Sequence, residues 1–174
     1  MTEQEISRGC RNRDRSAYAE LYSAYVGRIM AICLRYCGNR PDAEDVAQDC
    51  FVEAIRCIRR FEWRGDGSLA AWLDRLCVNC CLDFLRKRKR LQFGEDICED
   101  FEEIPVRDVP PNVLLEMISA LPDGQRVVFN LHCIEEMSHK EVGRKLGISE
   151  GTSASQYYRA RMALQTIIKK YLKK

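Results

Sequence analysis

The chain has 174 residues, of which 46% are hydrophobic, 31% are charged and only five are proline. This composition excludes a wholly disordered chain and favours a helical protein with one ordinary domain or two small ones. The net charge of +2 conceals a pattern, because residues 1–90 and 112–174 each carry four surplus basic groups whereas residues 91–111 carry six surplus acidic groups. Two basic segments indicate two contacts with nucleic acid.

The N-terminus has no basic start followed by an apolar stretch, so the sequence predicts no signal peptide. No window of about 18 apolar residues is present, so we expect no direct membrane insertion. The expected location is the cytoplasm. In that reducing compartment, the ten cysteines are expected to serve as small core residues in place of disulfides.

The N-terminal part, residues 1–90, is predicted to form a three- to four-helix bundle. Apolar residues recur at steps of three and four over residues 14–37, 41–60 and 69–88, which is the spacing of one helix face. Pro41 suits a first helical turn, and Ser68 is a good N-cap. Short connections between helices of this length favour a compact bundle.

Residues 91–111 lack periodicity and end at Pro110-Pro111. They predict an extended, poorly ordered acidic linker. Its acidic residues are Glu95, Asp96, Glu99, Asp100, Glu102, Glu103 and Asp108. Helical patterning resumes at Val113 and restarts after Pro122, so residues 112–174 form a second helical domain. The predicted fold class is therefore all-α, with two small helical domains.

The C-terminal domain carries the signature of a helix-turn-helix. Ser138 with Glu141 three residues later predicts a capping box, and Gly147 provides a tight turn before Ser149 caps another helix. The second helix of such a motif lies in the major groove of DNA, although a plain helical hairpin would share the pattern. The candidate DNA contacts are Ser149, Thr152, Ser155, Gln156 and Arg159. The hydroxyls of Ser149 and Thr152 would meet phosphate, Gln156 would pair with adenine, and Arg159 would contact guanine or phosphate.

Three N-terminal features have both a functional and a structural interpretation. The basic run of residues 86–90 fits a phosphate clamp or a solvated helix end. Trp63, beside a glycine-rich loop, is a candidate for stacking an unpaired base, whereas Trp72 occupies a core position. The acidic stripe fits a solvated face or a docking surface for a basic partner. Its members are Asp45, Gln48, Asp49 and Glu53.

The cysteines raise the question of a metal. Cys77, Cys80 and Cys81 share one predicted helix, and Cys33 and Cys37 share another, so a mixed thiolate site is geometrically possible. However, no second Cys-x-x-Cys hairpin is present, and both histidines lie in the C-terminal part. We therefore expect packing, with no metal and no cofactor. No phosphate loop, nucleophile elbow or His-Glu-x-x-His motif is present, so no catalytic residues are assigned and no enzyme is predicted.

Three motifs in order resemble the extracytoplasmic-function (ECF) sigma factors of bacterial RNA polymerase. Residues 42–51 are similar to the helix with which this family grips the polymerase clamp. Residues 68–73, with Asn79, Asp83 and Leu85-Arg86, are similar to its promoter-melting helix. Leu121-Pro122 and residues 138–164 resemble its helix-turn-helix. The resemblance covers nearly the whole chain.

This resemblance implies a promoter-reading subunit with core RNA polymerase, promoter DNA and an anti-sigma factor as partners, and a monomer when free. The acidic stripe, including Asp45, Gln48 and Asp49, would dock on the clamp. Asn79 and the loop of residues 61–68 would hold a base flipped out of the −10 element. Arg86, Lys87 and Arg88 would contact phosphates there. The helix-turn-helix would read the −35 duplex, and the acidic linker would thread the RNA exit path.

The sequence departs from the family pattern in the recognition helix. The family commonly has Val-Lys-Ser-Arg-Leu after the helix threonine, whereas Thr152 is followed here by Ser-Ala-Ser-Gln-Tyr, which removes two basic groups. Two other hypotheses also remain at this point. One is a free-standing helix-turn-helix regulator with an N-terminal sensor or dimerisation domain, and the other is a switch that senses thiol oxidation or a metal.

Overall fold

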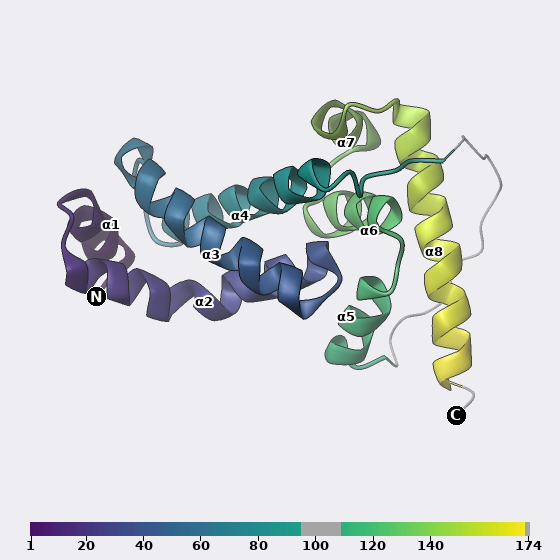
Figure 1. Ribbon diagram of the computed structural model, residues 1–174, viewed down its shortest axis with the longest axis horizontal. Coiled ribbons are helices and arrows are strands. Elements are labelled where there is room, and N and C mark those ends of the chain that lie inside the picture. Colours follow the sequence, from purple (N-terminus) through teal and green to yellow (C-terminus); the bar gives the residue numbers. More distant parts are fainter. Residues whose placement is uncertain (95–108, 173–174) are drawn as a thin grey trace. The chain divides into compact units, whose positions relative to one another are not determined.

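The computed structural model describes residues 1–94 and 109–172, and its contacts divide the chain into two compact units, Met1–Lys87 and Arg88–Lys174. All regular structure in the described residues is helical, which confirms the predicted all-α fold class (Figure 1). The acidic residues of the predicted linker, from Glu95 to Asp108, lie outside the described residues.

The N-terminal unit is a bundle in which α2, α3 and α4 pack against one another and α1 packs on α2 (Figure 1). The helices begin and end where the sequence provides caps. Asp14 accepts a hydrogen bond from the Ser16 N–H, and Gly38 ends a helix with a φ of 76°, in the left-handed region that suits glycine. The elements are α1 (Glu3–Arg11), α2 (Arg15–Cys37), α3 (Arg40–Cys57), the 3₁₀ turn η1 (Ile58–Arg60) and α4 (Ser68–Lys87).

Helix α1 lies outside the three helices that the sequence patterning indicated. It begins with a capping box, because the Thr2 hydroxyl accepts from the Glu5 N–H while the Glu5 carboxylate accepts from the Thr2 N–H. Its buried face is narrow, with Ile6 and Cys10 as its apolar members. The Thr-x-x-Glu spacing at residues 2–5 was therefore a usable helix-start signal.

The bundle interior is almost entirely apolar. Fully buried side chains include Leu21, Ile29, Tyr36, Leu73 and Leu82. At the surface, Arg28 of α2 donates two hydrogen bonds to Asp74 of α4, at 2.6 and 2.7 Å. This bidentate pair fixes the register of the two helices.

The C-terminal unit is organised around its long last helix, α8, which packs on α5, α6 and α7. One end of its core combines Leu121, Ala160, Leu164 and Ile168 with the buried Val109. The elements are α5 (Pro111–Ser119), α6 (Asp123–Phe129), the π-helical turn η2 (Asn130–Ile134), α7 (His139–Leu146) and α8 (Glu150–Leu172).

The structure differs from the expected linker at both ends. Arg90 donates two hydrogen bonds to Asp123 of α6, and the carbonyl of Gln92 lies so close to Gly124 that a Cβ there would overlap it. At the other end, Val109 belongs to the core around α8. Residues 88–94 and 109–110 therefore pack within the C-terminal unit, because charge pairing and apolar burial outweigh the cost of ordering short segments.

In the part of the chain described here, no helix is both long and apolar enough to cross a membrane.

Candidate nucleic-acid interfaces

The helix-turn-helix is built as the sequence predicts. The Ser138 hydroxyl accepts from the Glu141 N–H at 3.3 Å, and the Glu141 carboxylate accepts from the Ser138 N–H at 2.8 Å. Gly147 ends α7 with a φ of 71°. Gly143 permits the close turn, since a Cβ there would lie 2.8 Å from the Ile148 carbonyl oxygen. These contacts set α7 and α8 at the crossing that the motif requires.

The first turn of α8 presents two of the predicted contacts. Ser149 precedes the helix, and its hydroxyl accepts from the Thr152 N–H at 2.9 Å and lies 2.8 Å from the Thr152 hydroxyl. Ser149 is exposed and Thr152 is half-buried. Hydroxyls and N–H groups at a helix start are suited to phosphate oxygens.

Ser155 and Gln156, two of the predicted contacts, are buried in the structure. Both residues are only 2% exposed, because α8 turns this face toward the inside of the unit. In this arrangement neither side chain is accessible to a base edge. The exposed face of this part of α8 carries Gly151, Ala154 and Met162.

His139 and Ser153 connect the two helices of the motif. The His139 Nδ1 and the Ser153 hydroxyl are hydrogen-bonded at 3.0 Å. The His139 ring stacks on His132 at 4.0 Å between centroids. Burial and the neighbouring His132 lower the pKa of His139. This polar contact joins α7 to α8 in place of an apolar one.

Arg159 is half-buried, and its guanidinium lies against Gly94 in the space that a side chain there would fill. On α8, Arg159 lies one turn beyond Ser155. The segment of residues 88–94 therefore borders the predicted DNA-reading helix.

On the N-terminal unit, an aromatic pair lies beside two surface hollows, of which Phe61 lines one and Trp72 lines both. The rings of Phe61 and Trp72 lie 5.3 Å apart. Trp72 and Arg75 line both hollows, one of which also includes Arg60 and Arg64. Trp72 is half-buried instead of a full core residue. Sequence reasoning missed Arg75, whose place one turn after Trp72 on α4 was the available signal.

Of the five predicted −10 contacts, only Asn79 lines one of these hollows. Asn79 is exposed and lines the second hollow together with Trp72. Trp63 is 39% exposed but is not among the residues that line the first hollow. Arg86 and Lys87 are exposed in the last turn of α4, Arg88 follows them, and Arg86 pairs with Asp83 at 3.0 Å.

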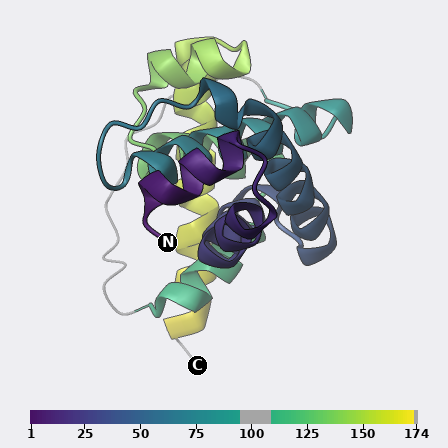
Figure 2. The same cartoon turned by 90° about the vertical axis from the view of Figure 1, so that its left-hand side faces the viewer.

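The loop before α4 is held in place by Glu3, a residue that sequence reasoning missed. Its carboxylate accepts from the N–H groups of Gly67 at 2.8 Å and Leu69 at 3.4 Å, and from the Tyr25 hydroxyl at 2.7 Å. Glu3 thus caps α4, whereas Ser68, the predicted N-cap, accepts from the backbone of the loop itself. Figure 2 shows α1 beside this loop.

Glu3 carries a negative charge at the positive end of α4. Although burial raises its pKa, the hydrogen bonds from Tyr25, Gly67 and Leu69 lower it further, so the net shift is downward. The ionised form is therefore the one that orders the loop.

The acidic stripe lies on the solvent face of α3. Asp45, Gln48 and Asp49 are exposed. Glu53 is half-buried and bonded to its own helix, since it accepts from Arg56 and from the Cys57 thiol, both at 3.0 Å. The hydrogen bond from Cys57 and the nearby Arg56 lower the pKa of Glu53.

Two apolar side chains accompany this stripe. Val52 is 58% exposed and Ile55 is 37% exposed. Single exposed apolar side chains are normal on protein surfaces, so these two fit a solvated face as well as a docking surface.

Comparisons with known proteins bear on both units. Residues 21–91 match the family model Sigma-70 region 2, and residues 112–164 match Sigma-70, region 4. The chain is 30% identical over 168 residues to "ECF RNA polymerase sigma factor SigW" of Bacillus subtilis, a match that covers 87% of this chain and 89% of that protein. The chain belongs to the ECF family of RNA polymerase sigma factors.

Other relatives and one solved structure are consistent with this membership. Identity with "ECF RNA polymerase sigma factor SigE" of Mycolicibacterium smegmatis is 28% over 165 residues, covering 89% of this chain but only 63% of that longer relative. The fold also resembles the sigma factor RpoE of Bartonella quintana, solved with the anti-sigma factor NepR. That comparison has a TM-score of 0.50 and 20% identity, and covers 87% of this chain and 96% of the other.

The predicted family and function are thus confirmed. As an ECF sigma factor, the protein binds core RNA polymerase and directs promoter-specific initiation of transcription; it is not an enzyme. A free-standing helix-turn-helix regulator would leave the region 2 match unexplained.

Proposed function

We propose that the two units divide promoter recognition, with the N-terminal unit docking on polymerase and opening the −10 element while the C-terminal unit reads the −35 duplex. The observation that carries this proposal is the half-buried ring of Trp72, which packs on the buried Phe61 and lines two hollows, one with Arg60, Arg64 and Arg75 and the other with Arg75 and Asn79. Flat rings stack unpaired bases, and arginines neutralise the adjacent phosphates.

The polymerase-docking surface is the exposed face of α3. Asp45, Gln48 and Asp49 lie at steps of three and four residues, and Val52 continues the row. Carboxylates of this kind steer a basic partner, and the apolar side chain adds buried area once contact is made. Glu53 contributes less in this scheme, because its carboxylate is already bonded to Arg56 and Cys57.

At the −10 element, one base of the non-template strand would leave the stack and enter a hollow beside Trp72. Asn79 carries an amide that can pair with a base edge, and Arg86, Lys87 and Arg88 follow at the end of α4 to meet the phosphates. Capture of the extruded base offsets an unstacking cost of about a few kcal/mol. Glu3 supports this step indirectly, since it fixes the loop from which Phe61 and Trp63 project.

At the −35 element, Ser149 and Thr152 would contact phosphate, and Arg159 would contact a base or phosphate. Arg159 lies against Gly94. For Arg159 to contact DNA, the segment of residues 88–94 would have to move away from it. Ser155 and Gln156, which are buried, are left out of the proposed interface.

An anti-sigma factor is the expected inhibitory partner, and the sigma factor is expected to be a monomer when released. Support comes from the Bartonella quintana sigma factor, which was solved in complex with an anti-sigma factor. If the docking surface is correctly assigned, an anti-sigma factor that blocks polymerase binding would cover α3.

The deciding experiment is transcription in a purified system, with this protein, bacterial core polymerase and a genomic promoter library. New starts that depend on the protein are expected, and their alignment would give the −10 and −35 sequences. Failure to initiate, together with tight binding to duplex DNA by the protein alone, would contradict the division of roles.

Paired variants assign the surfaces. Asp45→Ala with Gln48→Ala is expected to weaken core-polymerase binding by at least about tenfold without loss of helix content, whereas Arg40→Ala on the same helix should have little effect. Trp72→Ala and Trp63→Ala compare the two candidate stacking rings in open-complex formation, and Arg159→Ala tests the −35 contact. Unchanged polymerase affinity or promoter occupancy would remove the corresponding residue from its interface.

A further inference from the structure

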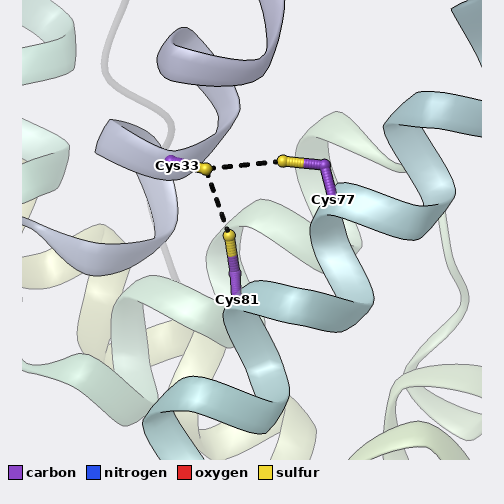
Figure 3. Close-up of side chains that lie close together, drawn as sticks. All are labelled: Cys33, Cys77 and Cys81. Carbon is purple, nitrogen blue, oxygen red and sulfur yellow. Dashed lines mark hydrogen bonds between the residues drawn. The ribbon is translucent and has the colours of Figure 1, made fainter. Parts of the chain in front are cut away.

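The N-terminal unit contains a concentration of sulfur that promoter recognition does not use. Six cysteine side chains from three helices meet in its interior, and the thiols of three of them lie within 4.8 Å of one another. Figure 3 shows these three, Cys33, Cys77 and Cys81, with their sulfur atoms turned toward a common point. The six are Cys33 and Cys37 of α2, Cys50 of α3, and Cys77, Cys80 and Cys81 of α4.

The spacing of the sulfurs matches the coordination shell of one ion. The Sγ of Cys33 lies 3.5 Å from that of Cys77 and 3.9 Å from that of Cys81. A metal–sulfur bond of about 2.3 Å in tetrahedral geometry places neighbouring sulfurs about 3.8 Å apart. These three sulfurs therefore need almost no movement to bind one metal ion, whereas an iron–sulfur cluster would require them to spread around several atoms.

A fourth sulfur, that of Cys50 on α3, interacts with Cys33 and Cys77, although it is not one of the three that lie within 4.8 Å of one another. The four come from three different helices, so the arrangement is produced by tertiary packing and not by a local motif. Cys10, which is equally buried on α1, has no such sulfur neighbours, since burial and Asp14 alone determine its raised pKa.

The hydrogen bonds within the cluster converge on one sulfur. The Cys81 thiol donates to the Cys33 sulfur at 3.9 Å, and the Cys33 and Cys77 sulfurs lie 3.5 Å apart. A metal ion at the common point would replace the shared protons and release them to solvent.

The cluster has a route to the surface. Cys80 is half-buried and lines two surface hollows, one shared with Asp49 and Glu53 and the other with Asn79. Its thiol interacts by hydrogen bonding with Cys50, which in turn contacts Cys33. Sulfur atoms therefore extend in steps from the solvent to the buried site, which provides the entry path that a buried metal site requires.

We propose that Cys33, Cys77 and Cys81, with Cys50 as the fourth sulfur, form a binding site for a single thiophilic d¹⁰ metal ion, Zn²⁺ or Cu⁺. An all-sulfur donor set selects such soft ions over magnesium, calcium or manganese. Binding would join α2, α3 and α4 at their centre and stabilise the unit that carries the docking surface, because Cys50 lies on the buried side of the helix that presents Asp49. The inference does not depend on the assigned promoter contacts.

Metal titration of the reduced full chain, with Cys133→Ser to remove an exposed thiol, tests this site. Zn²⁺ and Cu⁺ are titrated separately against chromogenic chelators under anaerobic conditions, which distinguishes the two ions. We expect one ion per chain for at least one of them and a higher midpoint of thermal unfolding when it is bound. Co²⁺ as a spectroscopic substitute for Zn²⁺ should give the intense sulfur-to-metal absorption of a tetrahedral thiolate site.

Matched variants locate the ion. Cys77→Ala is expected to weaken binding by at least about 100-fold, whereas Cys10→Ala, which removes an equally buried thiol outside the cluster, should change it by no more than about twofold. If Cys77→Ala does not fold, the Co²⁺ spectrum of the otherwise unchanged chain still decides the question. Absence of binding by both ions, an equal loss in Cys10→Ala, or a Cys33–Cys77 disulfide in the protein purified without reductant would overturn the proposal.

Discussion

The interiors of the two units differ in the number of polar side chains that they bury. Among the described residues of the N-terminal unit, Ser7 is the one buried polar residue, and its hydroxyl donates to the backbone carbonyl of Gln4. The C-terminal unit, which has the same length, buries five polar residues among those described. These are Arg126, Asn130, Ser153, Ser155 and Gln156.

This difference indicates which interactions specify the structure of each unit. The N-terminal bundle buries apolar and sulfur side chains, which tolerate small shifts, and keeps its charges outside for partners. In the C-terminal unit, each buried polar group must find its partner, because an unsatisfied one costs about 1–3 kcal/mol. Stability there should depend on a few individual contacts. The predictions below test that contrast, from the largest expected effect to the smallest.

Arg126→Leu should have the largest effect. The Arg126 guanidinium pairs with Asp123 and donates to the carbonyls of Leu121 at 2.5 Å and Ser119 at 3.3 Å. Its loss leaves Asp123 with Arg90 alone and strands the two carbonyls, so the C-terminal unit should lose about 3 kcal/mol. Hydrogen exchange of α6 and α8 in the full chain measures this loss.

Arg40→Ala is the matched control in the other unit. Arg40 pairs with Glu44 at 2.7 Å on the surface of α3, where the arginine is 74% exposed. An exposed pair is worth roughly 0.3–0.5 kcal/mol. Equal losses in the two variants would show that burial of the polar network does not matter as argued.

Glu3→Gln should loosen the loop that precedes α4. The neutral amide offers only one oxygen to the groups that now share a carboxylate, so a loss of about 1 kcal/mol is expected at residues 61–70, as for other helix caps. Because the pKa of Glu3 is lowered in the folded protein, its contribution is present above its usual value of 4.5 and is lost as the pH falls through the folded pKa.

Hydrogen exchange of the backbone amides of residues 61–70, measured at acidic pH, tests the role assigned to Glu3. The wild-type protein should show an acid-dependent opening of the loop that Glu3→Gln lacks. Acid opening that persists unchanged in the variant would assign the effect to another carboxylate.

Gln156→Leu separates a core role from a DNA contact. The Gln156 Nε2 is buried and has no hydrogen-bond partner among the described residues. Replacement by an apolar side chain of similar size should therefore raise the stability of the C-terminal unit by roughly 1 kcal/mol and leave promoter binding intact. A selective loss of −35 recognition would instead restore Gln156 to the DNA interface.

His139 should give the smallest effect, a pH dependence of the α7–α8 contact. Burial and His132 lower the pKa of His139 below its usual 6.5. The unfolded chain therefore takes up a proton first as the pH falls below 6.5, and the C-terminal unit becomes less stable, with no effect above that range. His139→Asn should flatten the dependence of the C-terminal unit's stability on pH between pH 7.5 and 5.5, measured by hydrogen exchange of the backbone amides in α8. An unchanged profile would assign the titration to another group.

Much of the architecture was predictable because helix formation depends on local spacing and caps. The periodicity of residues 14–37 and the Ser138–Glu141 capping box act over a few residues, and each predicted helix boundary there agrees with the structure within a residue or two. Exposure of Asp45, Gln48 and Asp49 also followed from helical spacing alone.

The side that a helix turns inward was harder to predict. Helical spacing alone does not separate two polar residues that neighbour one another, so Ser155 and Gln156 were assigned to solvent although α6 and α7 pack over α8. The same limit applies to Ile55, an apolar residue that packing leaves exposed.

By itself, the sequence determined the helices, their order and the family motifs, because those depend on interactions within a few residues or on local patterns. Only the tertiary structure decided that Glu3 caps a helix some 60 residues away, and that cysteines from α2, α3 and α4 meet at one point. Contacts between residues distant in the chain depend on how helix faces pack, and composition or spacing along one helix carries no record of that packing.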